Sequence, residues 1–150
     1  MAKLTFYGAI EGVTGSAYLL ETGDATLLLE CGLIQGNRKM EKANKEPFPF
    51  DVRNLDAVIL SHAHLDHTGR LPKLVADGYS GPIYMTYATC ELLEIMLMDA
   101  ASLQQRDTEW ENKRRRRAGK AEIEPLYTIE DVEAALQFCD GVGYGHHRKI

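Results

Sequence analysis

Three of the five histidines of this chain fall within one short segment, His62-Ala63-His64-Leu65-Asp66-His67. In an extended backbone His62 and His64 project to the same side, so both imidazoles can reach one ion. Asp66 and His67 follow on a change of chain direction, which lets them face a second ion beside the first. The pattern HxHxDH therefore predicts a metal site that uses four side chains.

Imidazole nitrogens and carboxylate oxygens together suit Zn²⁺, and Mn²⁺ and Fe²⁺ are compatible with the same ligand types. Two ions about 3.5 to 4 Å apart would share a hydroxide, because metal binding lowers the pKa of water towards about 7. Such a pair would clamp both oxygens of a displacement at phosphorus or carbon. Asp66 is expected both to bind a metal and to orient the hydroxide. Without a cation, the crowded imidazoles would repel one another when protonated.

The histidine segment lies between a buried strand and a helix. Ala57 to Leu60 is a continuous apolar run, which is typical of a strand covered on both faces, and it ends at Ser61. Leu71, Leu74 and Val75 then recur at helical spacing, and Gly78 is a plausible end for that helix. The four candidate ligands are therefore expected on a strand-to-helix turn.

Three short strands are expected upstream, over Leu4 to Gly8, Ala17 to Glu21 and Thr26 to Glu30. The turn at Gly23 and Asp24 indicates a hairpin between the second and the third. After them comes a glycine-punctuated loop and then a polar stretch that reaches Pro49, where the sequence indicates nothing regular.

Downstream, Pro82 to Met85 is expected to form a further strand, and a helix is expected from Thr89 onward. Its apolar stripe comprises Leu92, Leu93, Met96, Leu97, Ala100 and Leu103. A capping box at Thr128 and Asp131 predicts a last helix over Val132 to Phe138.

The chain has 150 residues, a net charge of -5 and 45% hydrophobic residues, which indicates a single soluble globular domain. No apolar run has the roughly 18 residues of a membrane span, and the N-terminus lacks the core of a signal peptide. Three widely spaced cysteines indicate reduced thiols and a cytoplasmic location. The run Lys113 to Arg117 either contacts phosphates or forms a solvated helix end.

The sequence resembles the metallo-β-lactamase superfamily, and within it the β-CASP branch of RNA-processing nucleases, relatives of the mRNA 3′-end cleavage endonuclease. The segments that carry the resemblance are the VTGS turn at 13–16, the CGLIQG loop at 31–36, the segment LSHAHLDHTGRLP at 60–72, and GPIY at 81–84. HxHxDH alone indicates only the superfamily. The other segments favour the nuclease branch.

This resemblance implies an αββα sandwich, two zinc ions and hydrolysis of RNA phosphodiesters. His62 and His64 would hold one zinc ion, and Asp66 and His67 the other. Where relatives usually have Asp at the end of the third strand, this chain has Glu30, whose extra methylene should shift the hydrogen bond that this carboxylate makes behind the metal ligands.

The resemblance also implies parts that the sequence does not contain: a third histidine in an Ala-Gly-His turn, a bridging aspartate, the β-CASP insertion and a distal histidine. His146 and His147 lie too early to replace them. We therefore expect α/β architecture that forms the N-terminal half of the sandwich, with a mixed sheet flanked by helices. Residues 1–150 would be an incomplete domain, with weak metal binding and weak or no activity by itself.

An incomplete sandwich would leave the inner face of its sheet without a covering layer, so we expect a homo-oligomer or a missing C-terminal half. Three functions stay open. The first is a zinc-dependent ribonuclease, with exonuclease or endonuclease action undecided. The second is another hydrolase of the superfamily, such as a thioester hydrolase. The third is a non-catalytic fragment that self-associates.

Overall fold

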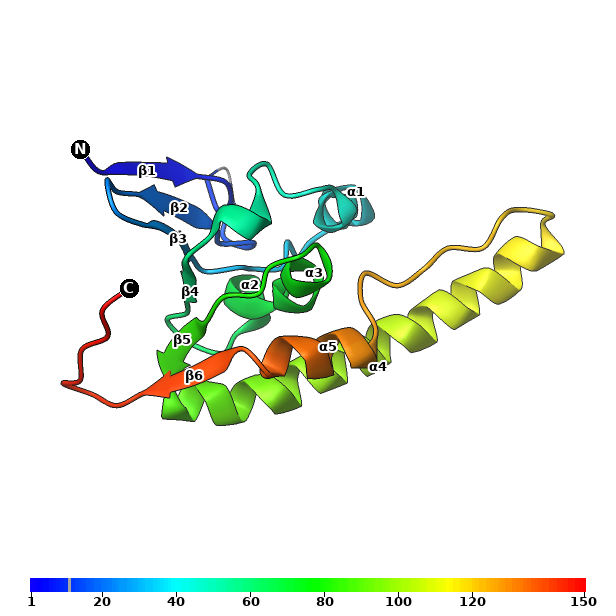
Figure 1. The fold of residues 1–150 in the computed structure, drawn as a ribbon. Coiled ribbons are helices and arrows are strands. Elements are labelled where there is room, and N and C mark those ends of the chain that lie inside the picture. The colour runs from blue at the N-terminus through cyan, green and yellow to red at the C-terminus, as the bar shows by residue number, and fades with distance from the viewer. Residues whose placement is uncertain (11) are drawn as a thin grey trace.

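Six strands form one mixed sheet in the computed structural model, which describes residues 1–10 and 12–150 (Figure 1). The sheet order is β1-β2-β3-β4-β5-β6. The first three strands pair antiparallel and the last four pair parallel. Their bounds are β1 Lys3–Phe6, β2 Tyr18–Glu21, β3 Thr26–Leu29, β4 Ala57–Ile59, β5 Ile83–Thr86 and β6 Cys139–Val142.

Helical segments connect the parallel strands. They are α1 Arg38–Glu41, η1 Lys42–Lys45, η2 Val52–Asn54, α2 Leu65–Thr68, α3 Leu71–Ala76, α4 Tyr87–Arg117 and α5 Ile129–Leu136. The longest, α4, extends well past the rest of the molecule, and the chain returns beside it before α5 (Figure 1). None of the described helices combines the length and the apolar character that a membrane span requires.

The core lies between one face of the sheet and the helices. Leu28 pairs in register with Leu19 and Val58, and all three are buried. Against them pack Leu71 and Leu74 of α3, Leu93 and Leu97 of α4, and Val132 of α5. The expected α/β architecture, a mixed sheet flanked by helices, is confirmed.

The opposite face of the sheet is apolar and half-exposed. Phe6 lies beside Tyr18 in the register, with their rings edge to face and 5.4 Å apart. Phe6 keeps 54% of its surface exposed. Near β4 and β5 the C-terminal segment borders this face, where Ile59, Tyr84 and Ile150 help to line a pocket of about 300 Å³. This is the face that the sequence predicts to lack a covering layer.

The short segments between β3 and β4 depart from the sequence analysis. The stretch with no expected regular structure contains α1, η1 and η2. Asn37 begins α1, since its side chain accepts hydrogen bonds from the backbone N–H groups of Lys39 and Met40. These segments are too short to show a helical repeat of apolar residues, so the sequence did not predict them. The sequence analysis also did not predict strand β6. The capping box at Thr128 is confirmed, and it begins α5 at Ile129.

Two buried asparagines hold irregular segments by the same arrangement. Asn44 accepts a hydrogen bond from the backbone N–H of Ile34 and donates one to its carbonyl, both at 2.8 Å. Asn112 of α4 makes the same pair of 2.8 Å bonds with the backbone of Ile123 in the returning chain. Each asparagine amide therefore satisfies one backbone N–H and one backbone carbonyl that no helix or strand hydrogen bond satisfies.

The turn at α2 is held by backbone hydrogen bonds from two loops that are distant in sequence. The carbonyls of residues 65, 66 and 67 accept from the N–H groups of Leu33, Ser16 and Cys31, at 2.8, 2.9 and 2.7 Å. Gly32 permits this approach, because a Cβ placed on it would lie 1.7 Å from the Asp66 carbonyl oxygen. We call these three bonds the backbone clamp.

Gly32→Ala should destabilise the fold strongly. The added methyl group must displace the carbonyl of Asp66, so we expect a loss of about 3 kcal/mol or more in the free energy of unfolding, measured by urea denaturation. The matched control is Gly23→Ala, where a Cβ meets no heavy atom within 4 Å, and its effect should stay below about 1 kcal/mol. Equal midpoints for the two variants would contradict the clamp.

Two of the three cysteines, the buried Cys31 and the half-buried Cys139, should be unreactive in the folded protein. Burial raises the pKa of Cys31 and of Cys139 from 9.0 to about 12, so both thiols stay protonated at pH 8. In a Cys90→Ser background we expect no labelling by a thiol-specific disulfide reagent at pH 8 until urea is added. Because the unfolded thiols ionise near their ordinary pKa, the free energy of unfolding should also fall as pH rises from about 9 towards 12. Rapid labelling of the native variant would contradict this.

Candidate metal centre

The four predicted ligands lie where β4 gives way to α2, as the sequence predicts. His62 follows the end of β4, and His64 is the residue at which α2 begins, with extended φ and ψ of −61° and 143°. Asp66 and His67 belong to the first turn of α2. His62 and His64 therefore lie on the link from β4 to α2, and Asp66 and His67 lie on the short helix itself.

The structure brings these side chains together. The ring of His62 lies 4.7 Å from that of His64 and 4.1 Å from that of His67, measured between centroids. Nε2 of His67 lies 3.5 Å from Oδ2 of Asp66. His64 is exposed and the other three are half-buried, so the cluster is open to solvent on one side. His62 and His64 project to the same side of the chain, as expected for an extended segment.

Glu30 lies behind the cluster, with its side chain pointing at His67. Its Oε1 accepts a 3.0 Å hydrogen bond from the backbone N–H of Ser61, and its Oε2 lies 3.4 Å from Nδ1 of His67. Glu30 is 9% exposed and has a φ of 62°, in the left-handed region that non-glycine residues seldom adopt. A strained backbone of this kind persists only where the surroundings hold it, and here Oε1 is hydrogen-bonded while Oε2 faces His67 without a hydrogen bond.

Two hydroxyl side chains that the sequence analysis did not single out also shape the turn. Ser61 Oγ lies 2.8 Å from Nδ1 of His62. Thr68 is fully buried, and its hydroxyl bonds to the carbonyls of Ala63 and His64, at 3.3 and 3.1 Å. A threonine that bonds a carbonyl four residues earlier is a recognised local pattern, so the spacing of Thr68 from His64 is the signal that could have revealed it.

The donor set fits a divalent transition metal in its chemistry. Three neutral imidazoles and a carboxylate are ligands that zinc accepts, and Nδ1 of His67 and Oε2 of Glu30 are buried without a hydrogen-bond partner among the described residues. Within residues 1–10 and 12–150, however, no three His, Cys, Asp or Glu side chains are arranged to hold one ion. The rings face one another and their neighbours instead, so binding would require rotation of side chains on a fixed backbone.

Residues around the turn stabilise it without joining the cluster. The Arg70 guanidinium stacks 4.2 Å above the Phe48 ring, and its Nη2 donates to the carbonyl of Glu46. Burial lowers the pKa of Arg70. The backbone N–H of Arg70 donates to the Cys31 carbonyl at 2.9 Å, so the segment after α2 is tied to the same loop as the turn itself. Cys31 is buried and protonated, which is unsuited to a nucleophile.

The basic run at the end of α4 is largely occupied by local contacts. Arg114 pairs with Glu111 and lies 4.9 Å from the ring centroid of Trp110. Arg116 pairs with Glu122 at 2.7 Å, and Arg115 donates to the Ala121 carbonyl. These contacts hold the end of α4 against the returning chain. They favour the interpretation of the basic run as a solvated helix end over its interpretation as a phosphate-binding site.

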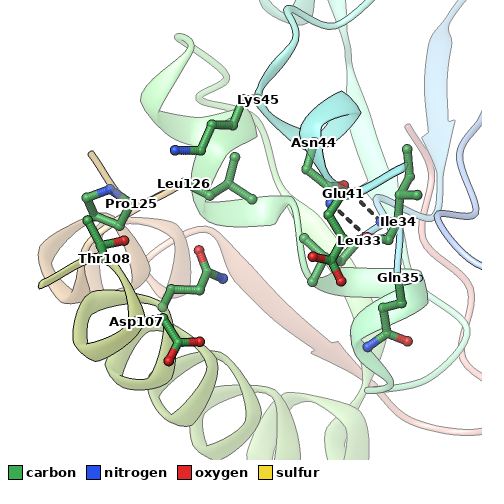
Figure 2. Close-up of a pocket in the computed structure, with 11 residues that line it drawn as sticks. Leu33, Ile34, Gln35, Glu41, Asn44, Lys45, Asp107, Thr108, Pro125 and Leu126 are labelled. Atoms are coloured by element: carbon green, nitrogen blue, oxygen red, sulfur yellow. Dashed lines mark hydrogen bonds between the residues drawn. The ribbon is translucent and has the colours of Figure 1, made fainter. Parts of the chain in front are cut away.

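A separate pocket of about 340 Å³ lies between the loop after β3, η1, α4 and the chain before α5 (Figure 2). Its lining combines apolar side chains such as Leu33 and Leu126 with the carboxylates of Glu41 and Asp107. None of its lining residues belongs to the histidine turn. His146 and His147 are exposed in the segment after β6.

Comparison with known proteins places this site in a family. A family model described as the metallo-beta-lactamase superfamily matches residues 10–148. Ribonuclease TTHA0252 of Thermus thermophilus is 45% identical over 148 residues, which cover 99% of this chain and 30% of that protein. Transcription termination factor FttA of Methanothermobacter thermautotrophicus is 37% identical over 113 residues, which cover 72% of this chain and 17% of that protein.

Among solved structures, the metallo-beta-lactamase fold protein YhfI from Bacillus subtilis aligns with a TM-score of 0.42 and 30% identity, covering 61% of this chain and 40% of that chain. This chain spans less than a third of the length of either relative named above. The resemblance inferred from the sequence is confirmed, and relatives named ribonuclease and FttA agree with its RNA-processing branch. With the family model matching residues 10–148, this chain belongs to the metallo-β-lactamase superfamily, whose members are hydrolases that generally bind divalent metal ions.

Proposed function

We propose that this chain carries part of the active site of a zinc-dependent phosphodiester hydrolase that acts on RNA, a ribonuclease of the β-CASP type. The observation that carries the proposal is the convergence of three imidazoles and the Asp66 carboxylate on one turn whose backbone is clamped from two sides. A site of this composition suits a displacement reaction at phosphorus that is assisted by metal ions.

Each residue of the turn has a distinct task in this proposal. His62 and His64 bind one ion through imidazole nitrogen, while Asp66 and His67 bind the other. Zinc, when bound, supplies a Lewis acid and a nucleophile at neutral pH. Asp66 would orient the attacking group, and Glu30 would orient the ring of His67, since its Oε2 lies 3.4 Å from Nδ1. Solvent exposure of His64 leaves one side of the site open to the substrate.

RNA as the substrate class is supported by the relatives named ribonuclease and transcription termination factor. Because this chain spans less than a third of their length, we propose it as the N-terminal part of a metallo-β-lactamase-like domain. The apolar open face of its sheet suits packing against a second sheet. The three free thiols are compatible with action in the cytoplasm.

Zinc affinity tests the site without relying on turnover. We expect weak binding by the purified chain, measured by competition with a chromogenic chelator, since only His62 and His64 serve the first ion. The double variant His62→Ala/His64→Ala should lose this binding. The matched control, His146→Ala/His147→Ala, removes two exposed histidines outside the turn and should keep it. Equal loss in both variants would contradict the assignment.

Substrate choice separates the ribonuclease from other hydrolases of the superfamily. With zinc present, we expect slow cleavage of a labelled single-stranded RNA oligonucleotide, abolished by a chelator and by Asp66→Asn, and no hydrolysis of a glutathione thioester. Thioester hydrolysis that exceeds RNA cleavage would favour the alternative hydrolase. If zinc binds but neither substrate reacts, this chain is the non-catalytic fragment of the third interpretation.

Glu30→Gln should weaken metal binding while the fold is retained. The amide oxygen can still accept from the Ser61 N–H, but the charge that faces His67 is lost, and we expect zinc affinity to fall about 10-fold or more. Glu91→Gln, an exposed carboxylate on α4, is the control. Thermal unfolding of both variants reports on the fold, and an unchanged zinc affinity in Glu30→Gln would remove Glu30 from the site.

A further inference from the structure

Helix α4 exposes an apolar face that points away from the body of the molecule. Leu92, Ile95, Leu103 and Trp110 recur at helical spacing and keep 54%, 68%, 46% and 59% of their surface exposed. Leu93 and Leu97, on the opposite side, are fully buried in the core. The helix is therefore apolar on two sides. One of them stays exposed, and on that side the Trp110 ring is contacted by Arg114 of the same helix, 4.9 Å from its centroid. Single exposed apolar residues are ordinary, but a row of four along one helix marks an interaction surface.

Two charged side chains complete this face. Asp99 and Arg106 lie between the apolar residues at the same helical spacing, and both are exposed. Neither takes part in an ion pair within the described part of the chain. One negative and one positive charge thus occupy equivalent positions on either side of Leu103.

We propose that this face is self-complementary and that two copies of the chain pair through α4 in antiparallel orientation. In the register centred between Ser102 and Leu103, Leu103 packs near its own copy at the two-fold axis. Ile95 then lies opposite Trp110 of the second copy, and Asp99 lies opposite Arg106. The symmetry repeats each contact, so two apolar pairs and two ion pairs form around the central leucines.

The charges select this arrangement over a parallel one. In a parallel pair with aligned helices, Asp99 would face Asp99 and Arg106 would face Arg106, and like charges at such positions oppose pairing. The antiparallel arrangement pairs opposite charges and also aligns the helix dipoles favourably. Ion pairs at a helix seam contribute chiefly to orientation and register, while the apolar residues supply the attraction.

The geometry of α4 permits the contact. The segment from Ile95 to Trp110, which this register pairs with its own copy, extends about 23 Å at 1.5 Å per residue, or about four turns. The helix is already held by the core on its other side, with α5 and the returning chain packed against it, so little order is lost on pairing. This inference is independent of the metal site and of the proposed activity.

Charge reversal tests the pairing directly. Sedimentation velocity at micromolar concentration should show the wild-type chain as a dimer of the 16.8 kDa protomer. Asp99→Arg and Arg106→Asp alone each create two like-charge contacts and should raise the dimer dissociation constant at least about 10-fold. The double variant Asp99→Arg/Arg106→Asp restores both pairs and should recover the dimer. A mixture of the two single variants should form a heterodimer.

Controls separate this surface from the open face of the sheet. Ile95→Glu/Leu103→Glu should yield monomer with an unchanged circular dichroism spectrum, whereas Gln105→Glu, exposed on another side of α4, should leave the dimer intact. A wild-type chain that sediments as a monomer at 100 micromolar overturns the proposal. A double variant that stays monomeric also overturns it. So does a dimer whose dissociation constant is unchanged by the single charge reversals, and that result would indicate pairing through the open face of the sheet.

Discussion

The position of the histidine turn depends on hydrogen bonds between backbone groups. Three carbonyls of α2 point towards the loops before β2 and after β3, and those loops supply the N–H groups that they need. A single helical turn has only a few internal hydrogen bonds, so it would not persist without partners from outside. Because these partners come from two loops, any displacement of α2 would break hydrogen bonds to both of them.

Side-chain hydrogen bonds add to the backbone clamp in fixing the position of the histidine turn. Glu30 ends β3 in a left-handed conformation and ties that end to the start of the turn through Ser61, while the hydroxyl of Thr68 closes the turn from within. The strained backbone at Glu30 is held by burial of the side chain and by the hydrogen bond from the Ser61 N–H to its carboxylate. The cluster therefore lies on a rigid backbone, and its imidazoles retain rotational freedom about χ1 and χ2 alone. Metal binding would use that freedom without rebuilding the loop.

Strands β1 to β5 and the location of the candidate site could be predicted from the sequence, because apolar runs of strand length and an unusual histidine pattern are local signals. The order of the strands in the sheet was not predicted, because it depends on pairing between segments distant in sequence. The backbone clamp could not be predicted, since it joins Ser16, Cys31 and Leu33 to α2 through groups that every residue has. The stripe expected on α4 merged two faces: Leu93 and Leu97 are buried, whereas Leu92 and Leu103 are exposed. Periodicity identifies apolar positions on a helix but does not say which of them the same chain covers.

The paired amides of Asn44 and Asn112 make the fold sensitive to chemical ageing. Each side chain presents an oxygen to an isoleucine N–H and an NH₂ group to the same isoleucine's carbonyl. Deamidation replaces the NH₂ group by oxygen, so an acceptor would then face the carbonyl in a buried position where neither group can turn to water. Loss of one nitrogen atom at Asn44 would thus release the loop next to the histidine turn, and the same loss at Asn112 would detach the returning chain from α4.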